Sequence, residues 1–309
     1  LAKAIWERLC PEGWPLRIQE LPEGTALVGG ALRDVLLGEL QVKPDLDLVV
    51  PTQAIELSRS FAQKLGGKSV TLDFDRDMAR LVVRGWTIDF ASRLGATLEE
   101  DLWRRDFRLN AIGLTLDSNS RLYDPTGGIP DLFAKRLTAV SEQNLLEDPL
   151  RLLRGLRLMA QHQLSLESET RIAIRTHAAM LPMAAPERIQ SELKLLVTAN
   201  SADEVMPLLK GYGLLDLWKN TGKSFDTPAP SLRNAKDFFS VEKSLALPLA
   251  RLTHLLSDDG LAKLRFSRRE CQRCKTLRKW QDRYDGFAFK SLDESDLLQL
   301  HQDLENDLP

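Results

Sequence analysis

The spacing of hydrophobic residues divides the chain into a first part with strands and helices and a second part with helices only. In the first part, short apolar runs that alternate with polar residues or lie between turn residues predict strands at 26–28, 45–50, 69–74, 79–84 and 86–90. Helical spacing predicts helices at 1–9 and 52–65. From about residue 143 onward, the pattern indicates helices alone. We therefore predict an α+β fold, with a small N-terminal mixed sheet and helices followed by an all-α remainder.

Length and composition indicate a globular protein with more than one domain. At 309 residues the chain is long for a single core, and 43% hydrophobic with 28% charged residues is an ordinary globular composition. We find no apolar run long enough to cross a membrane and no secretory signal, so we expect no membrane partner. Three cysteines cannot all pair with one another, which favours a reducing cytoplasm.

A glycine pair and two aspartates indicate phosphate chemistry. Gly29 and Gly30 lie between a predicted strand and a helix, where backbone N–H groups can approach a phosphate at the helix N-terminus. Asp45 and Asp47 alternate with leucines, so both carboxylates point to one face of a strand. Two neighbouring carboxylates repel each other unless a cation lies between them, and Mg²⁺ prefers hard oxygen ligands of this kind. Taken singly, these features are also typical of an ordinary turn and of a solvated strand face.

A second group of polar residues follows the predicted sheet. Arg104 and Arg105 precede Asp106, and Asn110 comes four residues later. Guanidinium groups bind a triphosphate bidentately, and a neighbouring carboxylate or amide can orient ribose hydroxyls. The alternative is an exposed helix with local ion pairs. Asp89 lies between apolar residues on the last predicted strand. It is a candidate catalytic acid, and the alternative is a carboxylate at a strand edge that is hydrogen-bonded to backbone.

The whole chain has a net charge of −2, but its charges are unevenly distributed near the C-terminus. The stretch 265–283 is rich in basic residues, which we expect to contact RNA phosphates, and the candidates are Arg268, Arg269, Arg273, Lys275, Arg278 and Lys279. Cys271 and Cys274 lie within this stretch, but no second pair of ligands stands at zinc-knuckle spacing and no strand precedes them. We therefore expect no zinc or redox site there.

Two further motifs complete a recognisable order. A turn-rich segment runs from Asp124 through Gly127 and Gly128, and Glu147-Asp148 stands three residues before Arg151 at the start of a helix. Together with the glycine pair, the paired aspartates and the Arg-Arg-Asp group, this order resembles the class II tRNA nucleotidyltransferase and bacterial poly(A) polymerase family, within the polymerase-β-like superfamily. The resemblance covers residues 24–200 well. It implies a nucleotidyltransferase head at 1–142, a helical neck at 143–200 and a tRNA-binding body at 201–309.

The resemblance also implies roles for the candidate residues. Asp89 would join Asp45 and Asp47 as the third catalytic carboxylate, and the acids would hold two Mg²⁺ ions. Gly29, Gly30, Arg33 and Arg105 would hold the triphosphate of CTP or ATP, Asp106 and Asn110 the ribose, and Asp148 and Arg151 the base. Arg154 shares their helix face, because residues three apart lie side by side on a helix.

The chemistry of the base supports such a protein template. Cytosine and adenine each show an amino donor beside a ring acceptor, which an aspartate acceptor and an arginine donor complement. Uracil and guanine show a carbonyl and a ring N–H instead, and each mispaired buried group costs about 1–3 kcal/mol. The alternative is a surface stripe of ion pairs.

One departure from the family pattern indicates which nucleotides are added. Enzymes that build the whole CCA end carry a flexible segment between the metal-bearing strands and the Arg-Arg-Asp motif, whereas only four residues, 94–97, precede the helix at Leu98 here. In the family, loss of this segment accompanies CC addition, with the last nucleotide left to a partner A-adding enzyme. The alternatives are an A-adding or full CCA-adding enzyme, a poly(A) polymerase, and a catalytically silent RNA-binding protein.

Overall fold

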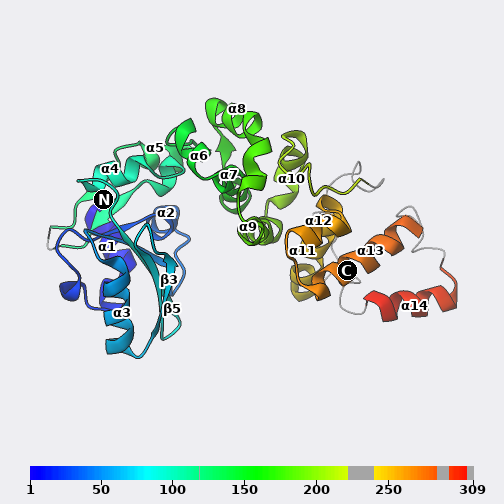
Figure 1. Ribbon diagram of the computed structural model, residues 1–309, viewed down its shortest axis with the longest axis horizontal. Coiled ribbons are helices and arrows are strands. Elements are labelled where there is room, and N and C mark those ends of the chain that lie inside the picture. Colours follow the sequence, from blue (N-terminus) through cyan, green and yellow to red (C-terminus); the bar gives the residue numbers. More distant parts are fainter. Residues whose placement is uncertain (118, 222–239, 284–291, 305–309) are drawn as a thin grey trace. The chain divides into compact units, whose positions relative to one another are not determined.

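The computed structural model describes residues 1–117, 119–221, 240–283 and 292–304. The chain divides into two compact units, Leu1–Asn144 and Leu145–Pro309. The first unit combines a mixed sheet with helices, and the second is almost entirely helical, so the predicted α+β class is confirmed (Figure 1). The division of the second unit into a neck and a body stays a prediction.

A seven-stranded sheet forms the core of the first unit, in the order β3-β4-β5-β2-β1-β6-β7. Its central strands β2 and β5 are parallel, and the other neighbours are antiparallel. The strands are β1 Ala26–Val28, β2 Leu46–Val50, β3 Lys68–Asp73, β4 Met78–Val83, β5 Trp86–Ser92, β6 Gly113–Thr115 and β7 Leu122–Tyr123. Strands β6 and β7 were not predicted; β1 is as short as β6, but the Gly29-Gly30 turn that follows it marks it in the sequence.

Helices cover different parts of the two sheet faces. Helix α3 packs against β3, β4 and β5 (Figure 1). Phe61 of α3 stacks on Phe90 of β5 with ring centroids 5.9 Å apart. On the opposite face, Leu98 and Leu102 of α4 pack against Val49 of β2. The helices of this unit are α1 Ala2–Leu9, α2 Gly30–Leu37, α3 Ala54–Leu65, α4 Leu98–Trp103 and α5 Gly128–Phe133, with 3-10 turns at Pro11–Gly13, Ile18–Glu20 and Arg108–Asn110. The short strand β8, Arg136–Leu137, and α6, Glu142–Glu147, follow.

The turn-rich segment after β7 is structural. The Asp124 carboxylate accepts hydrogen bonds from the backbone N–H groups of Gly128 at 2.6 Å and Ile129 at 3.0 Å. A Cβ on Gly128 would lie 2.0 Å from the carbonyl oxygen of Arg108, so only glycine fits there. These contacts hold the start of α5 against the 3-10 turn at Arg108–Asn110.

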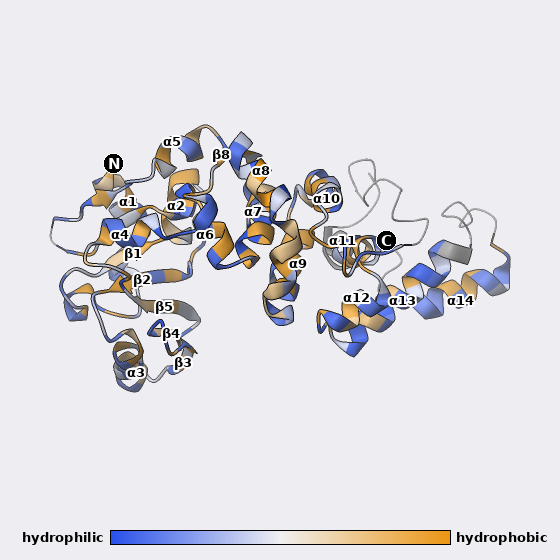
Figure 2. Cartoon of the chain, turned by 45° about the horizontal axis from the view of Figure 1, so that its top comes forward, coloured by the Kyte–Doolittle hydropathy of each residue, from blue (hydrophilic) through white to orange (hydrophobic). Residues whose placement is uncertain are grey.

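Amphipathic helices build the second unit, and Figure 2 shows hydrophobic and hydrophilic residues on different sides of them. They are α7 Leu150–His162, α8 Ser168–Thr176, α9 Pro186–Thr198, α10 Ala202–Gly211, α11 Ser240–Leu255, α12 Asp258–Lys263, α13 Arg268–Arg283 and α14 Glu294–Leu304, with a 3-10 helix at Ala178–Met183. Strand β9, Ser165–Leu166, is an exception to the predicted all-α structure. Among the residues described, no helix has both the length and the apolar character needed to cross a lipid bilayer.

Candidate active site

Three carboxylates meet where β2 and β5 run parallel in the centre of the sheet. Asp47 pairs with Asp89 in the register of these strands, and Asp45 lies just before β2. Burial raises the pKa of Asp47 to about 6; the charges of Asp89 and Asp45 add to this effect, and Arg105 opposes it. The structure thus brings the three predicted acids together, and such hard oxygen donors fit a divalent cation.

Arg80 distinguishes Asp89 from the other two acids. It lies opposite Asp89 on β4, and its Nε and Nη2 atoms donate to the two carboxylate oxygens of Asp89, each at 2.8 Å. Each oxygen of Asp89 keeps a second lone pair, so a cation that took Asp89 as a ligand would share this carboxylate with Arg80. The sequence held a signal for this pair, because a two-residue turn at Arg84-Gly85 places residues 80 and 89 opposite each other.

Gly29 lies in a place that only glycine can occupy. It precedes α2 with a φ of 74°, in the left-handed region. A Cβ there would lie 3.0 Å from Oδ2 of Asp47 and 3.7 Å from Nη1 of Arg105. The next residue, Gly30, donates its backbone N–H to the Asp47 carboxylate. The predicted phosphate cradle therefore lies directly beside the carboxylates.

The Arg-Arg-Asp group is held by residues that the sequence analysis did not single out. Arg105 Nη2 donates to Oδ2 of Asp101 at 3.0 Å, and the other oxygen of Asp101 accepts from the Leu94 N–H at 3.0 Å. Asn144 Nδ2 donates to the carbonyl oxygens of Trp103 at 2.8 Å and Arg105 at 2.7 Å. The four-residue spacing from Asp101 to Arg105 could have revealed the first contact.

The predicted ribose residues form a chain of contacts with Arg33. Arg33 Nη1 donates to Oδ1 of Asn110 at 2.9 Å, and Asn110 Nδ2 donates to Oδ1 of Asp106 at 3.2 Å. Arg33 also pairs with Asp34 at 2.8 Å. Asp106 is only 6% exposed, and its Oδ1 accepts the Phe107 N–H at 2.8 Å. The buried Asp106 thus holds the side chain of Asn110 in place. Direct contacts of Asp106 and Asn110 with a nucleotide stay predictions.

In the second unit, α9 holds two of the predicted base-reading residues. Arg188 Nη2 donates to Oδ2 of Asp148 at 2.7 Å, and Arg154 Nε donates to Glu192 at 3.0 Å. Burial raises the pKa of Asp148, but the hydrogen bond and charge of Arg188 outweigh it, so the pKa lies below its ordinary value. Asp148 lies just before α7, whose N-cap is Pro149, and Asp148 Oδ1 accepts the Leu150 N–H at 3.3 Å.

Comparison with known proteins shows the family of this chain. Residues 25–138 match the poly A polymerase head domain, and residues 163–218 match the probable RNA and SrmB-binding site of polymerase A. The CC-adding tRNA nucleotidyltransferase of Synechocystis sp. is 34% identical over 85% of this chain and 68% of its own length. The chain belongs to the tRNA nucleotidyltransferase family. The A-adding enzyme of Deinococcus radiodurans is 40% identical over 63% of this chain, but the match spans only 45% of that relative.

Solved structures of nucleotidyltransferases share the fold. A structure described as a tRNA-processing enzyme with CTP is 25% identical, covers 92% of this chain and 87% of that chain, and has a TM-score of 0.66. A Thermotoga maritima CCA-adding enzyme complexed with tRNA covers 99% of this chain and 75% of that chain, with 21% identity and a TM-score of 0.71.

The basic helix α13 of this nucleotidyltransferase has two different sides. Arg268, Arg269, Lys275 and Lys279 are exposed and lie at helical spacing, as a phosphate-binding stripe requires. Arg273 is half-buried. Arg278 differs from our expectation, because its side chain is only 14% exposed and its Nη2 donates to the carbonyl oxygen of Leu256 at 2.6 Å. Arg278 therefore lies on the inner side of the helix.

Cys271 and Cys274 of α13 are both free thiols. Cys274 is fully buried, and this burial raises the pKa of its thiol to about 11, so it is unreactive at neutral pH.

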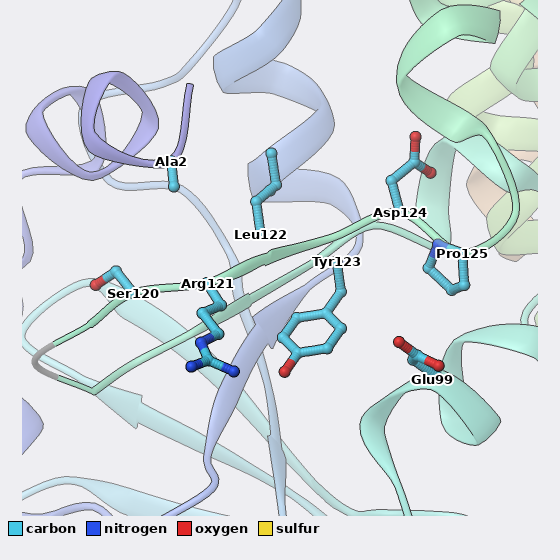
Figure 3. A pocket seen from close by; sticks show the side chains of 8 residues that line it. All are labelled: Ala2, Glu99, Ser120, Arg121, Leu122, Tyr123, Asp124 and Pro125. Carbon is cyan, nitrogen blue, oxygen red and sulfur yellow. The ribbon is translucent and has the colours of Figure 1, made fainter.

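A pocket of about 640 Å³ lies at the β7 edge of the sheet (Figure 3). It is lined by residues beside the edge strand β7, among them Glu99, Arg121 and Tyr123. None of the predicted catalytic or nucleotide-binding residues lines it. This pocket is therefore separate from the candidate active site around Asp47.

Proposed function

We propose that this enzyme adds two cytidine nucleotides to the 3′ end of tRNA and then stops. The observation that carries the proposal is the short and firmly held connection between β5 and α4. Five residues, 93–97, join these elements. In the family, enzymes whose nucleotide pocket switches from binding cytosine to binding adenine have a mobile segment at this place in the chain. A connection of five residues is too short to form such a segment.

Hydrogen bonds hold the connection along its length. The Arg93 N–H donates to the carbonyl oxygen of Val50 at 2.8 Å, and the Leu94 N–H donates to Asp101 at 3.0 Å. The Ala96 N–H donates to Glu100 at 2.8 Å, and Thr97 caps α4 by accepting from the Glu100 N–H. The CC-adding relative from Synechocystis supports this specificity. An A-adding activity is the second candidate, because the Deinococcus A-adding enzyme has the higher identity over the shorter match.

The proposed reaction is nucleotidyl transfer. The 3′-oxygen of the RNA forms a bond to the α-phosphorus of CTP, the bond to the bridging oxygen breaks, pyrophosphate leaves, and the hydroxyl proton passes to solvent. Asp45 and Asp47, with Asp89 as a third carboxylate, would hold the two Mg²⁺ ions, which would activate the 3′-hydroxyl and stabilise the leaving pyrophosphate. The high pKa of Asp47 fits this role, because a bound cation would favour the ionised carboxylate.

The chain's own residues would place the substrates. The turn at Gly29 and Gly30 before α2, with Arg33 and Arg105, would bind the triphosphate, and Asp106 and Asn110 would position the ribose. Asp148, Arg151 and Arg154 would select the base, with Asp148 and Arg154 held ready by the ion pairs from α9. The exposed stripe on α13 would bind tRNA phosphates. A partner A-adding enzyme would complete the CCA end, and the free cysteines support the cytoplasm as the compartment.

Three tRNA transcripts test the proposal: one ending before the CCA, one after the first C and one after CC. Each is incubated with CTP, with ATP and with both in the presence of Mg²⁺. Growth of the first transcript by two residues, of the second by one and of the third by none supports CC addition. Growth of the first by three, or addition of A to the third alone, overturns it. A long A tail identifies a poly(A) polymerase, and binding without any growth identifies a silent RNA-binding protein.

A further inference from the structure

The sheet face that carries the carboxylates continues outward onto β4 and β3. Asp89 pairs with Arg80, which in turn pairs with Val70, and in the next row Val82 pairs with Lys68. All of these side chains share the face of Asp47, because residues paired across neighbouring strands point to the same side. We call Lys68, Val70, Arg80 and Val82 the outer face.

The outer face is open to solvent although half of it is apolar. Val70 is 53% exposed and Val82 is 44% exposed, whereas α3 covers the other side of the same strands. A solvated sheet face normally carries polar side chains, and Val70 and Val82 offer apolar contacts on this one instead. Lys68 and Arg80 alternate with the two valines; Lys68 gives the surface a positive charge, and the charge of Arg80 is balanced by Asp89. Apolar contacts beside cations suit single-stranded nucleic acid, whose bases are apolar on their faces and whose phosphates are negative.

The order of the β-strands indicates which part of the substrate RNA would lie on the outer face. The phosphate cradle at Gly29 follows β1, and β1 adjoins β2 on the side opposite β5. The leaving pyrophosphate therefore lies on the β1 side of the carboxylates. Because the attacking oxygen and the leaving oxygen stand roughly in line across phosphorus, the RNA 3′-hydroxyl must approach from the β5 side. The outer face begins on β4, the next strand in that direction.

We propose that the outer face binds the single-stranded 3′-terminal nucleotides of the tRNA acceptor end and guides the 3′-hydroxyl toward Asp47 and Asp89. The strand β3 lies about 14 Å from β2, at about 4.8 Å for each of three strand spacings, which accommodates a few nucleotides. Bases rest on Val70 and Val82, and Lys68 binds the backbone. Arg80 links the two sites, because it pairs with Asp89 and lies beside Val70. This inference rests on the proposed function and names a new part of its RNA site.

The experiment compares two RNAs: a tRNA with its single-stranded 3′ nucleotides and the same tRNA trimmed to a blunt acceptor stem. Wild type and the Val70→Asp/Val82→Asp variant are tested for equilibrium binding of both RNAs and for the KM values of tRNA and CTP. Thr71→Asp is the matched control, because Thr71 is exposed on the same strand but pairs with the buried Ala79 on the opposite face. Val70→Thr/Val82→Thr keeps the β-branched shape and serves as a mild variant.

In the aspartate variant, we expect about a tenfold loss of affinity for the tRNA with its 3′ nucleotides. Affinity for the blunt tRNA and the KM for CTP should change less than about twofold, and the control should match wild type. The threonine variant should show a smaller loss in the same direction. Unchanged binding of the intact tRNA overturns the proposal, as does equal weakening of both RNAs. A change in oligomeric state by sedimentation without a change in RNA binding also overturns it, because a second copy then covers the face.

The test separates this proposal from the proposed function. Failure of the wild-type enzyme to extend any tRNA defeats the proposed function alone. The binding comparison between the two RNAs needs no catalysis and still supports or overturns the outer face.

Discussion

Replacing Asp47 with asparagine should stabilise the protein in the absence of divalent cations while it abolishes activity. The pKa of this carboxyl is raised from 3.8 to about 6 in the folded chain, chiefly by burial and then by Asp89. Above pH 6 the ionised form therefore opposes folding, because the unfolded chain releases the same proton more easily. The shift corresponds to about 3 kcal/mol, and partial exposure of the side chain makes this an upper bound.

The direction of the pH dependence follows from the raised pKa. The destabilisation by Asp47 is fully present above about pH 6 and disappears as the pH falls toward 4, because the folded state then gains its proton. Asparagine has nearly the same shape, can still accept the Gly30 N–H and carries no charge. The variant should therefore unfold several degrees higher than wild type at pH 8 in EDTA, and the two should converge near pH 4.

Thermal unfolding at pH 4 to 8, with EDTA and then with Mg²⁺, measures this effect. Mg²⁺ should raise the melting temperature of wild type more than that of the variant, because only wild type keeps both central carboxylates. Asp75→Asn is the control, since Asp75 is an exposed acid in the turn between β3 and β4. The reasoning is refuted by a variant that is no more stable than wild type at pH 8, or by a gain of equal size at pH 4.

Three further predictions concern activity and RNA binding. Asp45→Ala should abolish incorporation of every nucleotide and leave tRNA binding nearly unchanged; incorporation above about a hundredth of wild type in Mg²⁺ would contradict a metal-ligand role. Asp148→Ala should relax base choice more than it slows transfer, and unchanged discrimination against UTP and GTP in single-turnover assays would exclude a protein template. Charge reversal at Lys275 and Lys279 should lower the salt dependence of tRNA binding, by about one in the log–log slope for each lost phosphate contact, whereas Arg278→Ala should mainly reduce thermal stability. An unchanged slope would leave α13 as a solvated surface.

Local features of this protein were predictable because they depend on neighbouring residues. The strand alternation that places Asp45 and Asp47 on one face has a period of two, and the turn at Gly29 and Gly30 is marked by the residues themselves. The short connection before Leu98 is likewise a matter of counting residues, and the helix does begin there. These features suffice for the fold class and for the family.

Contacts between distant segments were decided by the tertiary structure. The parallel register that sets Asp47 beside Asp89 joins strands that are far apart in sequence, and a hydrophobic pattern does not specify which strands pair. The contact of Arg188 with Asp148 depends on the packing of α9. The contact of the Arg278 side chain with the Leu256 carbonyl depends on the packing of α13. Periodicity shows which side of an element is apolar, but the partner of each charged group follows only from the packing of whole elements against one another.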